Sequence, residues 1–152
     1  MPVNTCFDDL RQKPGSSIVQ HLVKSEDLNH HRTLCAGRLA EWFVEAGFIA
    51  AASLLPPEQI VCLKIHGLEF LHPVRAGEIA NFMGKIVYAG RSSLMAYVHM
   101  EAAGKQIVAG FLTFIHVDEN GKTMPHGLAI TPDSEEEQAL YEQARALAKR
   151  PA

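Results

Sequence analysis

The sequence has 152 residues, of which 47% are hydrophobic and 20% are charged. A chain of this length suits one domain, residues 1–152, that buries roughly two thirds of the surface exposed by its unfolded form. Its 14 basic and 17 acidic residues give a net charge of −3, and no basic run marks a nucleic-acid surface. The three cysteines form no CxxC pair, so we expect neither a disulfide framework nor a zinc site.

Two further features bear on where the protein acts. The apolar stretch of residues 42–55 is shorter than the roughly 20 residues that a bilayer span needs. Residues 1–9 carry acids and no basic segment, which is unlike a secretory signal. The sequence therefore predicts a soluble cytoplasmic protein with neither a membrane nor a nucleic acid as partner.

The predicted elements begin with a strand at residues 17–24, a polar loop at 25–32 and a long helix at 36–55. Apolar residues in this helix recur at intervals of three and four, which is helical spacing. Val44 and Phe48 add apolar groups on further faces, so we expect burial on most sides. The helix should end at Pro56 and Pro57.

Strand-like runs follow at residues 59–65, 78–88, 92–101 and 106–117, with short connections that favour antiparallel pairing. The apolar phase shifts by one residue at Gly67, which predicts a β-bulge there. A last helix is expected at residues 134–149, with Ser134 and Glu137 as a capping box. One apolar helix and an antiparallel sheet around it indicate an α+β hotdog fold with a core over residues 17–121. The open edge of such a sheet favours a homodimer or larger homo-oligomer.

Candidate chemistry begins in the loop before the long helix. Asn29, His30, His31 and Thr33 lie where unpaired N–H groups at a helix start can hold an oxyanion. Asn29, His30 or His31 could orient a water or a substrate beside that site. Helix capping and a solvated loop are the alternative interpretation of the same residues.

Glu45 is the second candidate, because a carboxylate in so apolar a helix is out of keeping with its surroundings. The alternative is that Glu45 lies on a wet side of the helix or pairs with Arg38 or Lys64. Glu41 is a weaker candidate for the same role. None of the eight histidines is spaced as HxxxH, so we expect no metal site.

Gly90, Arg91, Ser92 and Ser93 join two predicted strands. Arginine and serine donors on a tight turn are suited to phosphate binding. A plain hairpin turn would show the same residues, and both interpretations remain open at this point.

Residues 29–39 (NHHRTLCAGRL) resemble the N-x-H-G-T-L-F-G-G-x-L signature of the hotdog-fold acyl-CoA thioesterases, the acyl-CoA hydrolase family. Residues 67–78 (GLEFLHPVRAGE), 90–93 (GRSS) and 114–121 (FIHVDENG) are similar to three later family segments, in the family's order and spacing. The resemblance covers residues 28–121 and leaves the last helix outside it.

The resemblance implies hydrolysis of an acyl-CoA thioester to a free acid and CoA, with no cofactor besides the CoA of the substrate. It places the thioester oxygen near the N–H groups of Ala36 and Gly37, and Asn29 beside the water. A helix carboxylate acts as general base or nucleophile, often at a site shared by two subunits. His30, His31 and Thr33 belong to the same motif, and the turn of residues 90–93 would meet the CoA phosphates or pantetheine.

The sequence departs from the family pattern at its catalytic acid. Counting from Ala36, the usual aspartate position falls on Val44, and Glu45 comes one residue later. Glu45 is therefore the predicted carboxylate, with Glu41 as the alternative. A second hypothesis is a non-catalytic acyl-CoA binding module or sensor. A hotdog dehydratase is disfavoured because the sequence lacks a His–Asp/Glu arrangement at dehydratase positions.

Overall fold

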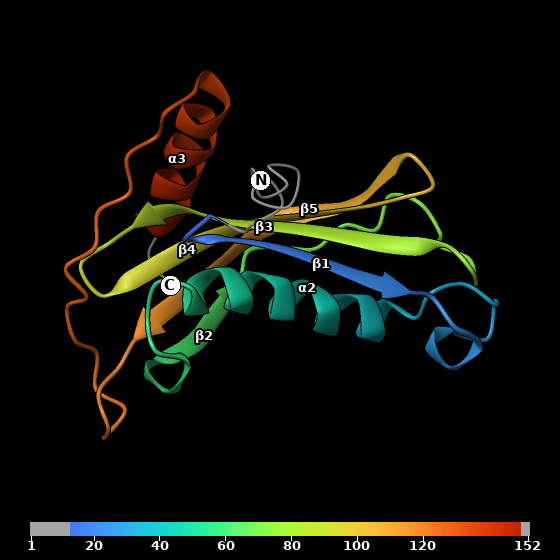
Figure 1. Cartoon of the computed structure of the whole chain (residues 1–152), viewed down its shortest axis with the longest axis horizontal. Helices are drawn as coiled ribbons and strands as arrows, with labels where there is room; N and C mark the ends of the chain where they lie inside the picture. The colour runs from blue at the N-terminus through green and yellow to red at the C-terminus, as the bar shows by residue number, and fades with distance from the viewer. Residues whose placement is uncertain (1–12, 150–152) are drawn as a thin grey trace, which may run out of the picture.

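The computed structural model describes residues 13–149. A five-stranded antiparallel sheet, in the order β1-β3-β4-β5-β2, carries one helix on each face (Figure 1). The strands are β1 (Ser16–Leu22), β2 (Ile60–Ile65), β3 (Ile79–Ala89), β4 (Ser93–Ala102) and β5 (Lys105–His116). The helices are α2 (Ala36–Ala52) and α3 (Glu135–Ala148), with 3-10 turns η1 (Ser25–Asp27) and η2 (Pro57–Gln59). The predicted hotdog arrangement is confirmed.

The core lies between α2 and the sheet, where Phe43 and Phe82 are fully buried. The helix approaches β1 and β3 very closely at one point. The Ser17 hydroxyl donates a hydrogen bond to the Ala46 carbonyl oxygen over 2.7 Å. A Cβ added to Gly84 would lie 2.9 Å from the same oxygen, so only glycine fits under the helix without movement.

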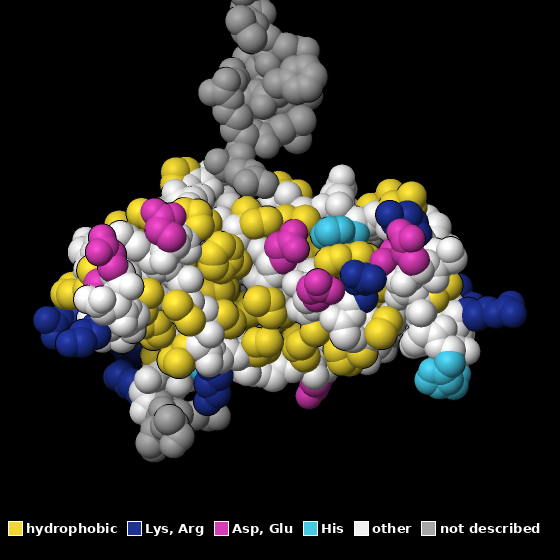
Figure 2. Space-filling model, turned by 90° about the horizontal axis from the view of Figure 1, so that it is seen from below, with side chains coloured by type: hydrophobic (Ala, Val, Ile, Leu, Met, Phe, Trp, Pro, Cys, Tyr) yellow, Lys and Arg dark blue, Asp and Glu magenta, His cyan; other side chains and the backbone are white. Residues whose placement is uncertain are grey.

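One face of α2 is open in the single chain, contrary to the expectation of burial on most sides. Its residues Gly37, Glu41 and Glu45 are exposed, because the sheet contacts only the opposite face. Figure 2, viewed from the side of α2, shows hydrophobic side chains across the centre of this surface with few charges among them. The helix also ends at Ala52, three residues before the predicted Leu55.

The predicted bulge at Gly67 is wrong in position. The register of β2 against β5 shifts between Cys62 and Lys64 instead, and β2 ends at Ile65. Gly67 has φ +96°, a left-handed conformation that favours glycine. The following segment leaves the ladder but stays beside β5, since the Leu71 N–H donates to the Ile107 carbonyl over 2.9 Å.

The last helix, α3, packs on the sheet face opposite α2 (Figure 1), through Ala144 against Val87, Met95 and Phe111. Ser134 caps it as predicted, accepting a hydrogen bond from the Glu137 N–H over 3.1 Å. The Glu137 carboxylate accepts from the Asp133 N–H and also pairs with Lys85. Within residues 13–149, no helix is long and apolar enough to cross a membrane.

Candidate active site

The loop before α2 is closed by the side chain of Asn29. Its Oδ1 accepts hydrogen bonds from the His31 N–H at 2.8 Å, the Thr33 N–H at 3.2 Å and the Thr33 hydroxyl at 3.3 Å. The Asn29 N–H donates to the Thr33 carbonyl over 2.8 Å. Asn29 therefore shapes the loop through Oδ1, and its amide nitrogen is the group left for a substrate or a water.

Helix α2 begins without a side-chain cap. Cys35 occupies the N-cap position and makes no side-chain hydrogen bond to the first turn, and that turn contains no acidic residue. The N–H groups of Ala36 and Gly37 consequently have no partner within the helix. They can donate to an oxygen that becomes negatively charged during a reaction.

A cavity of about 250 Å³ lies beside this helix start. It brings together three residues expected from the sequence, namely Asn29, Thr33 and Ala36. The sequence did not single out the other residues that line the cavity. Most of them belong to residues 67–78, the segment that resembles a later family motif. These other lining residues are Leu34, Leu39, Phe70, Leu71, His72, Pro73 and Val74.

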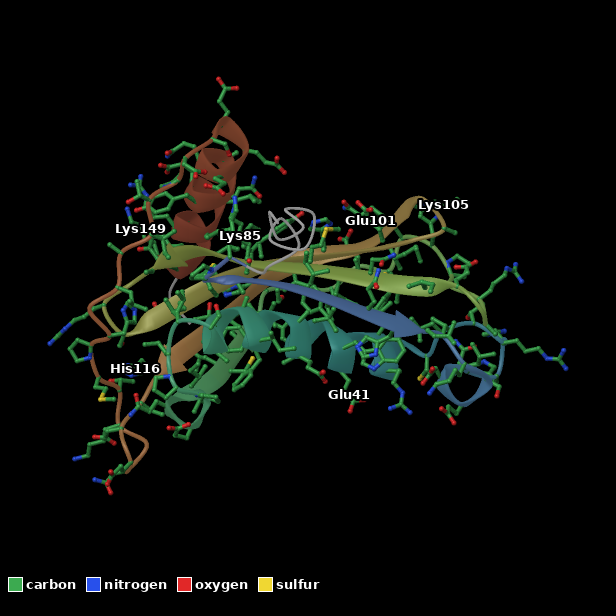
Figure 3. All side chains as sticks on the ribbon, in the orientation of Figure 1. Glu41, Lys85, Glu101, Lys105, His116 and Lys149 are labelled. Atoms are coloured by element: carbon green, nitrogen blue, oxygen red, sulfur yellow. The ribbon has the colours of Figure 1, made fainter. Side chains whose placement is uncertain are left out.

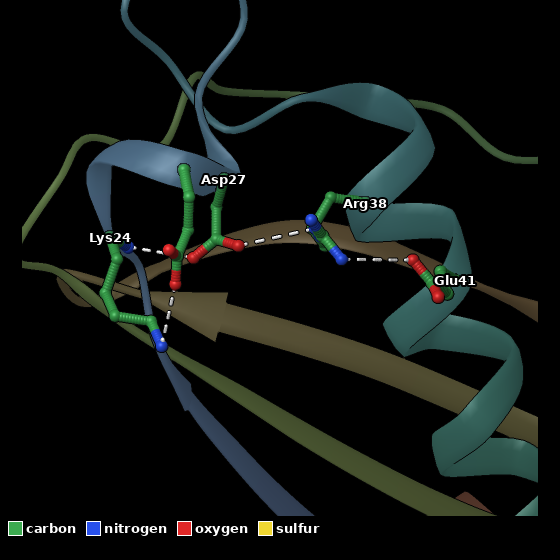
Figure 4. Close-up of polar contacts among 5 residues, drawn as sticks. Lys24, Asp27, Arg38 and Glu41 are labelled. Carbon is green, nitrogen blue, oxygen red and sulfur yellow. Dashed lines mark hydrogen bonds and ion pairs between the residues drawn. The ribbon is translucent and has the colours of Figure 1, made fainter.

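An ion-pair network fixes the loop to the helix (Figure 4). Asp27, only 5% exposed, lies 3.3 Å from Arg38 and accepts a hydrogen bond from the Lys24 N–H at 2.9 Å. Arg38 also pairs with Glu41 at 3.5 Å. Because Asp27 belongs to η1 and Arg38 to α2, this pair holds the loop against the first helical turn.

The two adjacent histidines point outward. His30 and His31 are exposed, and their ring centroids lie 3.9 Å apart. Neither lines the cavity beside Ala36. Thr33 is half-buried and forms a β-bridge with Arg75, so it couples the loop to the segment after β2.

Glu45 lies on the exposed face of α2. This agrees with the alternative interpretation of the sequence, in which Glu45 occupies a solvent-facing side of the helix. Glu45 comes nine positions after Ala36, which corresponds to about 13 Å along the helix axis. Figure 3 shows that Glu41 likewise projects from α2 away from the sheet. Within one chain, Glu45 is therefore separated from the helix start where Asn29 and Ala36 meet.

The turn of residues 90–93 lies at the opposite end of the sheet from Asn29 (Figure 1). Strand β3 starts at Ile79, next to Leu22, and runs to Ala89 just before the turn. Its 11 residues span about 33 Å. Arg91 is exposed there, and Ser92 and Ser93 are half-buried. One chain thus does not bring this turn together with the Asn29 loop.

The edge strand β2 exposes apolar side chains to solvent. Val61 is 51% exposed and Leu63 is 65% exposed, while Phe70 and Leu71 extend the apolar surface beyond the strand. Burial lowers the pKa of nearby His66, and Lys64 adds to that effect. An unpaired edge of this kind is a template for a further strand.

Comparisons with known proteins agree on one family. Residues 31–109 match the model of the thioesterase superfamily. A Bacillus subtilis protein described as an uncharacterized acyl-CoA thioester hydrolase, YkhA, is 28% identical over 78% of this chain and 71% of its own length. A Haemophilus influenzae protein of the same description is 23% identical over 81% of this chain and 85% of its own length.

Solved structures give the same result for the fold. A hexameric acyl-CoA thioesterase superimposes with a TM-score of 0.82 at 27% identity, covering 90% of both chains. A Staphylococcus aureus acyl-CoA hydrolase, solved with butyryl-CoA and CoA, has a TM-score of 0.80 at 25% identity, covering 90% of this chain and 83% of its own.

Proposed function

Because the chain belongs to the thioesterase superfamily, we propose that it hydrolyses acyl-CoA thioesters to a free acid and CoA. The observation that carries this proposal is the cavity at the uncapped start of α2, lined by Asn29, Thr33 and Ala36. The similarity to acyl-CoA thioester hydrolases supports the same substrate class.

In the proposed reaction, the thioester oxygen accepts hydrogen bonds from the N–H groups of Ala36 and Gly37. Water attacks the carbonyl carbon, with the Asn29 amide placing it and the Glu45 carboxylate taking its proton. The C–S bond then breaks, CoA leaves as the thiolate, and this thiolate takes up the proton. The helix start contributes most where negative charge develops on the oxygen. No resident cofactor takes part in this scheme.

We place each site between two subunits. Glu45 lies about 13 Å along α2 from Ala36 in its own chain, so the carboxylate at a given helix start belongs to the partner. The exposed apolar side chains of the β2 edge, Val61 and Leu63, support pairing of two copies there. Such a two-fold dimer would supply each site with groups from both chains. The hexameric relative supports a homo-oligomer built from such dimers.

The turn of residues 90–93 is proposed to bind the phosphates or the pantetheine of CoA. Arg91 offers an exposed guanidinium suited to phosphate. The turn's distance from Asn29 within one chain is compatible with a substrate that extends across a subunit boundary. His30 and His31 flank the same loop as Asn29 and are proposed to contact the substrate from the solvent side.

A non-catalytic acyl-CoA binding module is the second candidate, and Val44 at the usual acid position favours it. A thiol-release assay across acyl-CoA chain lengths, run beside calorimetric CoA binding, separates the two. The proposed function predicts steady turnover for at least one chain length. Binding with no thiol released by any acyl-CoA would favour the binding module.

A further inference from the structure

Asp27 contacts the chain on both sides of the proposed oxyanion donors. Its carbonyl oxygen accepts a hydrogen bond from the Cys35 N–H over 2.8 Å. Its carboxylate lies 3.3 Å from Nε of Arg38 (Figure 4). Ala36 and Gly37, whose N–H groups are proposed to hold the thioester oxygen, stand between these two contacts in the sequence. One residue therefore holds both ends of the segment that carries the donors.

Asp27 also begins the segment that carries Asn29. The Asn29 N–H donates to the Thr33 carbonyl over 2.8 Å, and a β-bridge one residue before Asn29 continues this pairing toward Asp27. Asn29 lies two residues after Asp27, about 7 Å along this extended segment. Asp27 thus connects the residue proposed to place the water with the helix turn proposed to bind the oxygen.

The Asp27 carboxylate is buried and both of its oxygens have partners. Asp27 is 5% exposed, Oδ2 accepts a hydrogen bond from the Lys24 N–H over 2.9 Å, and Oδ1 pairs with Arg38. These partners are needed because an unpaired carboxylate is costly to bury. Asp27 and Arg38 line a separate cavity of about 520 Å³, and neither lines the cavity beside Ala36. Asp27 is therefore placed to support the proposed site without touching the substrate.

From these contacts we infer that Asp27 is a positioning residue of the proposed hydrolysis. Its main-chain contact to Cys35 and its side-chain contact to Arg38 keep the first turn of α2 in a fixed place relative to Asn29. Oxyanion stabilisation requires donors that are already in place when the charge develops, so a displaced turn lowers kcat. The inference rests on the proposed function, because it takes this turn as the site of the thioester oxygen.

Two substitutions remove the contact between Asp27 and Arg38 without altering a main-chain group. In Asp27→Asn the amide oxygen can still accept from the Lys24 N–H, but the amide nitrogen meets the guanidinium as a second donor. Arg38→Met keeps a long apolar stem and has no donor. Arg38→Gln is the conservative variant, because its amide nitrogen takes the place of Nε and can donate to the Asp27 carboxylate.

Glu137 provides a matched control away from the proposed site. Its carboxylate also accepts a backbone hydrogen bond, from the Asp133 N–H over 2.9 Å, and also pairs with a basic side chain, that of Lys85. Glu137 belongs to α3, on the sheet face opposite α2 (Figure 1). Glu137→Gln therefore removes an ion pair of the same kind and leaves the start of α2 unchanged.

The experiment measures kcat and KM for one acyl-CoA by thiol release and Kd for CoA by calorimetry, and urea unfolding checks that each variant is folded in the assay. Asp27→Asn and Arg38→Met should each lower kcat by about tenfold or more, since a displacement of about 1 Å can cost about 10² in rate. KM and Kd should not change, because neither side chain touches the substrate. The double variant should be no slower than the slower single variant, because both remove the same contact.

Two further variants complete the experiment. Arg38→Gln should recover most of the kcat that Arg38→Met loses, and Glu137→Gln should have normal kcat. A role in stability alone would leave kcat normal in every folded variant, and this result would overturn the inference. Arg38→Gln as slow as Arg38→Met, or Glu137→Gln as slow as Asp27→Asn, would also overturn it.

The Arg38 variants decide the outcome if Asp27→Asn does not fold, because the Arg38 side chain is 41% exposed and its loss buries no new group. The unmodified protein separates failure of the inference from failure of the proposed function. Normal kcat in both Asp27→Asn and Arg38→Met, beside an active unmodified protein, overturns only the role of Asp27. An unmodified protein that releases no thiol from any acyl-CoA overturns the proposed function, and the inference fails with it.

Discussion

Val44 and Glu45, neighbours in α2, face different sides of the helix: Val44 is half-buried and Glu45 is exposed. One residue turns an α-helix by about 100°. Val44 shares its face with Phe48, whose ring contacts Phe114 of β5 at a centroid distance of 6.0 Å. A carboxylate at position 44 would therefore point toward β5 and the apolar β2 edge, whereas Glu45 lies on the solvent-exposed side of the helix.

The first prediction concerns which carboxylate acts. Glu45→Gln should lower kcat for acyl-CoA hydrolysis by about 10² or more, since general-base catalysis contributes that much. Glu41→Gln is the matched control, because Glu41 is exposed on the same helix and already pairs with Arg38. Steady-state thiol release measures both variants.

Full activity in Glu45→Gln together with loss in Glu41→Gln would move the role to Glu41. Adding Val44→Asp to Glu45→Gln returns a carboxylate to the usual family position. We expect this double variant to recover part of the lost turnover.

The second prediction separates the two roles of Asn29. Asn29→Ala should reduce both stability and activity, since the loop loses an acceptor of three hydrogen bonds. Asn29→Asp keeps the oxygen and removes the amide donor. It should unfold at nearly the normal temperature yet hydrolyse acyl-CoA poorly, as calorimetry and thiol release would record. Normal activity in Asn29→Asp would show that the Asn29 amide nitrogen takes no part in hydrolysis.

The third prediction concerns the exposed β2 edge. Leu63→Lys should prevent pairing of β2 with a second copy, because a charge on an edge strand blocks strand addition. Light scattering after size-exclusion chromatography should show a monomer, and thiol release should be lost. Leu22→Lys, on the β1 edge and 53% exposed, should leave the dimer intact. A Leu63→Lys dimer with full activity would contradict the proposed interface.

The fourth prediction concerns the close approach of α2 to the sheet. Gly84→Ala should lower the free energy of unfolding by about 2 kcal/mol, because the added methyl group meets the Ala46 carbonyl and α2 must shift. Gly37→Ala is the control, since its nearest neighbour would be Cys35 Sγ at 3.9 Å. Urea unfolding should find Gly37→Ala as stable as the unmodified protein or more so. Equal stability of Gly84→Ala would contradict the packing described.

Local patterns predicted much of this molecule. The spacing of apolar residues located α2, and Ser134 located the start of α3. The motif at residues 29–39 identified the helix start as the candidate site. These features depend on residues close together in sequence, where periodicity and capping act directly.

Features that depend on distant residues were not predictable in this way. The register shift of β2 follows from its pairing with β5 and was misplaced at Gly67. The Asp27–Arg38 pair and the contact of His126 with Ser93 join segments that only the fold brings together. The separation of residues 90–93 from Asn29 follows from the path of β3. The distance between Glu45 and Ala36 along α2 is the reason that a second subunit enters the proposed mechanism.

We propose that the protein is an acyl-CoA thioesterase whose site takes Asn29 from one subunit and Glu45 from the other. The most direct test of this proposal is thiol release by Asn29→Ala and Glu45→Gln chains co-expressed with different tags and compared with each variant alone. Each variant alone should be inactive. In random two-fold dimers, half are mixed and each mixed dimer has one intact site, so the mixture should regain about a quarter of normal activity. A mixture as inactive as its parents, beside an active unmodified protein, would contradict the shared site, and an unmodified protein that releases no thiol would contradict the enzyme itself.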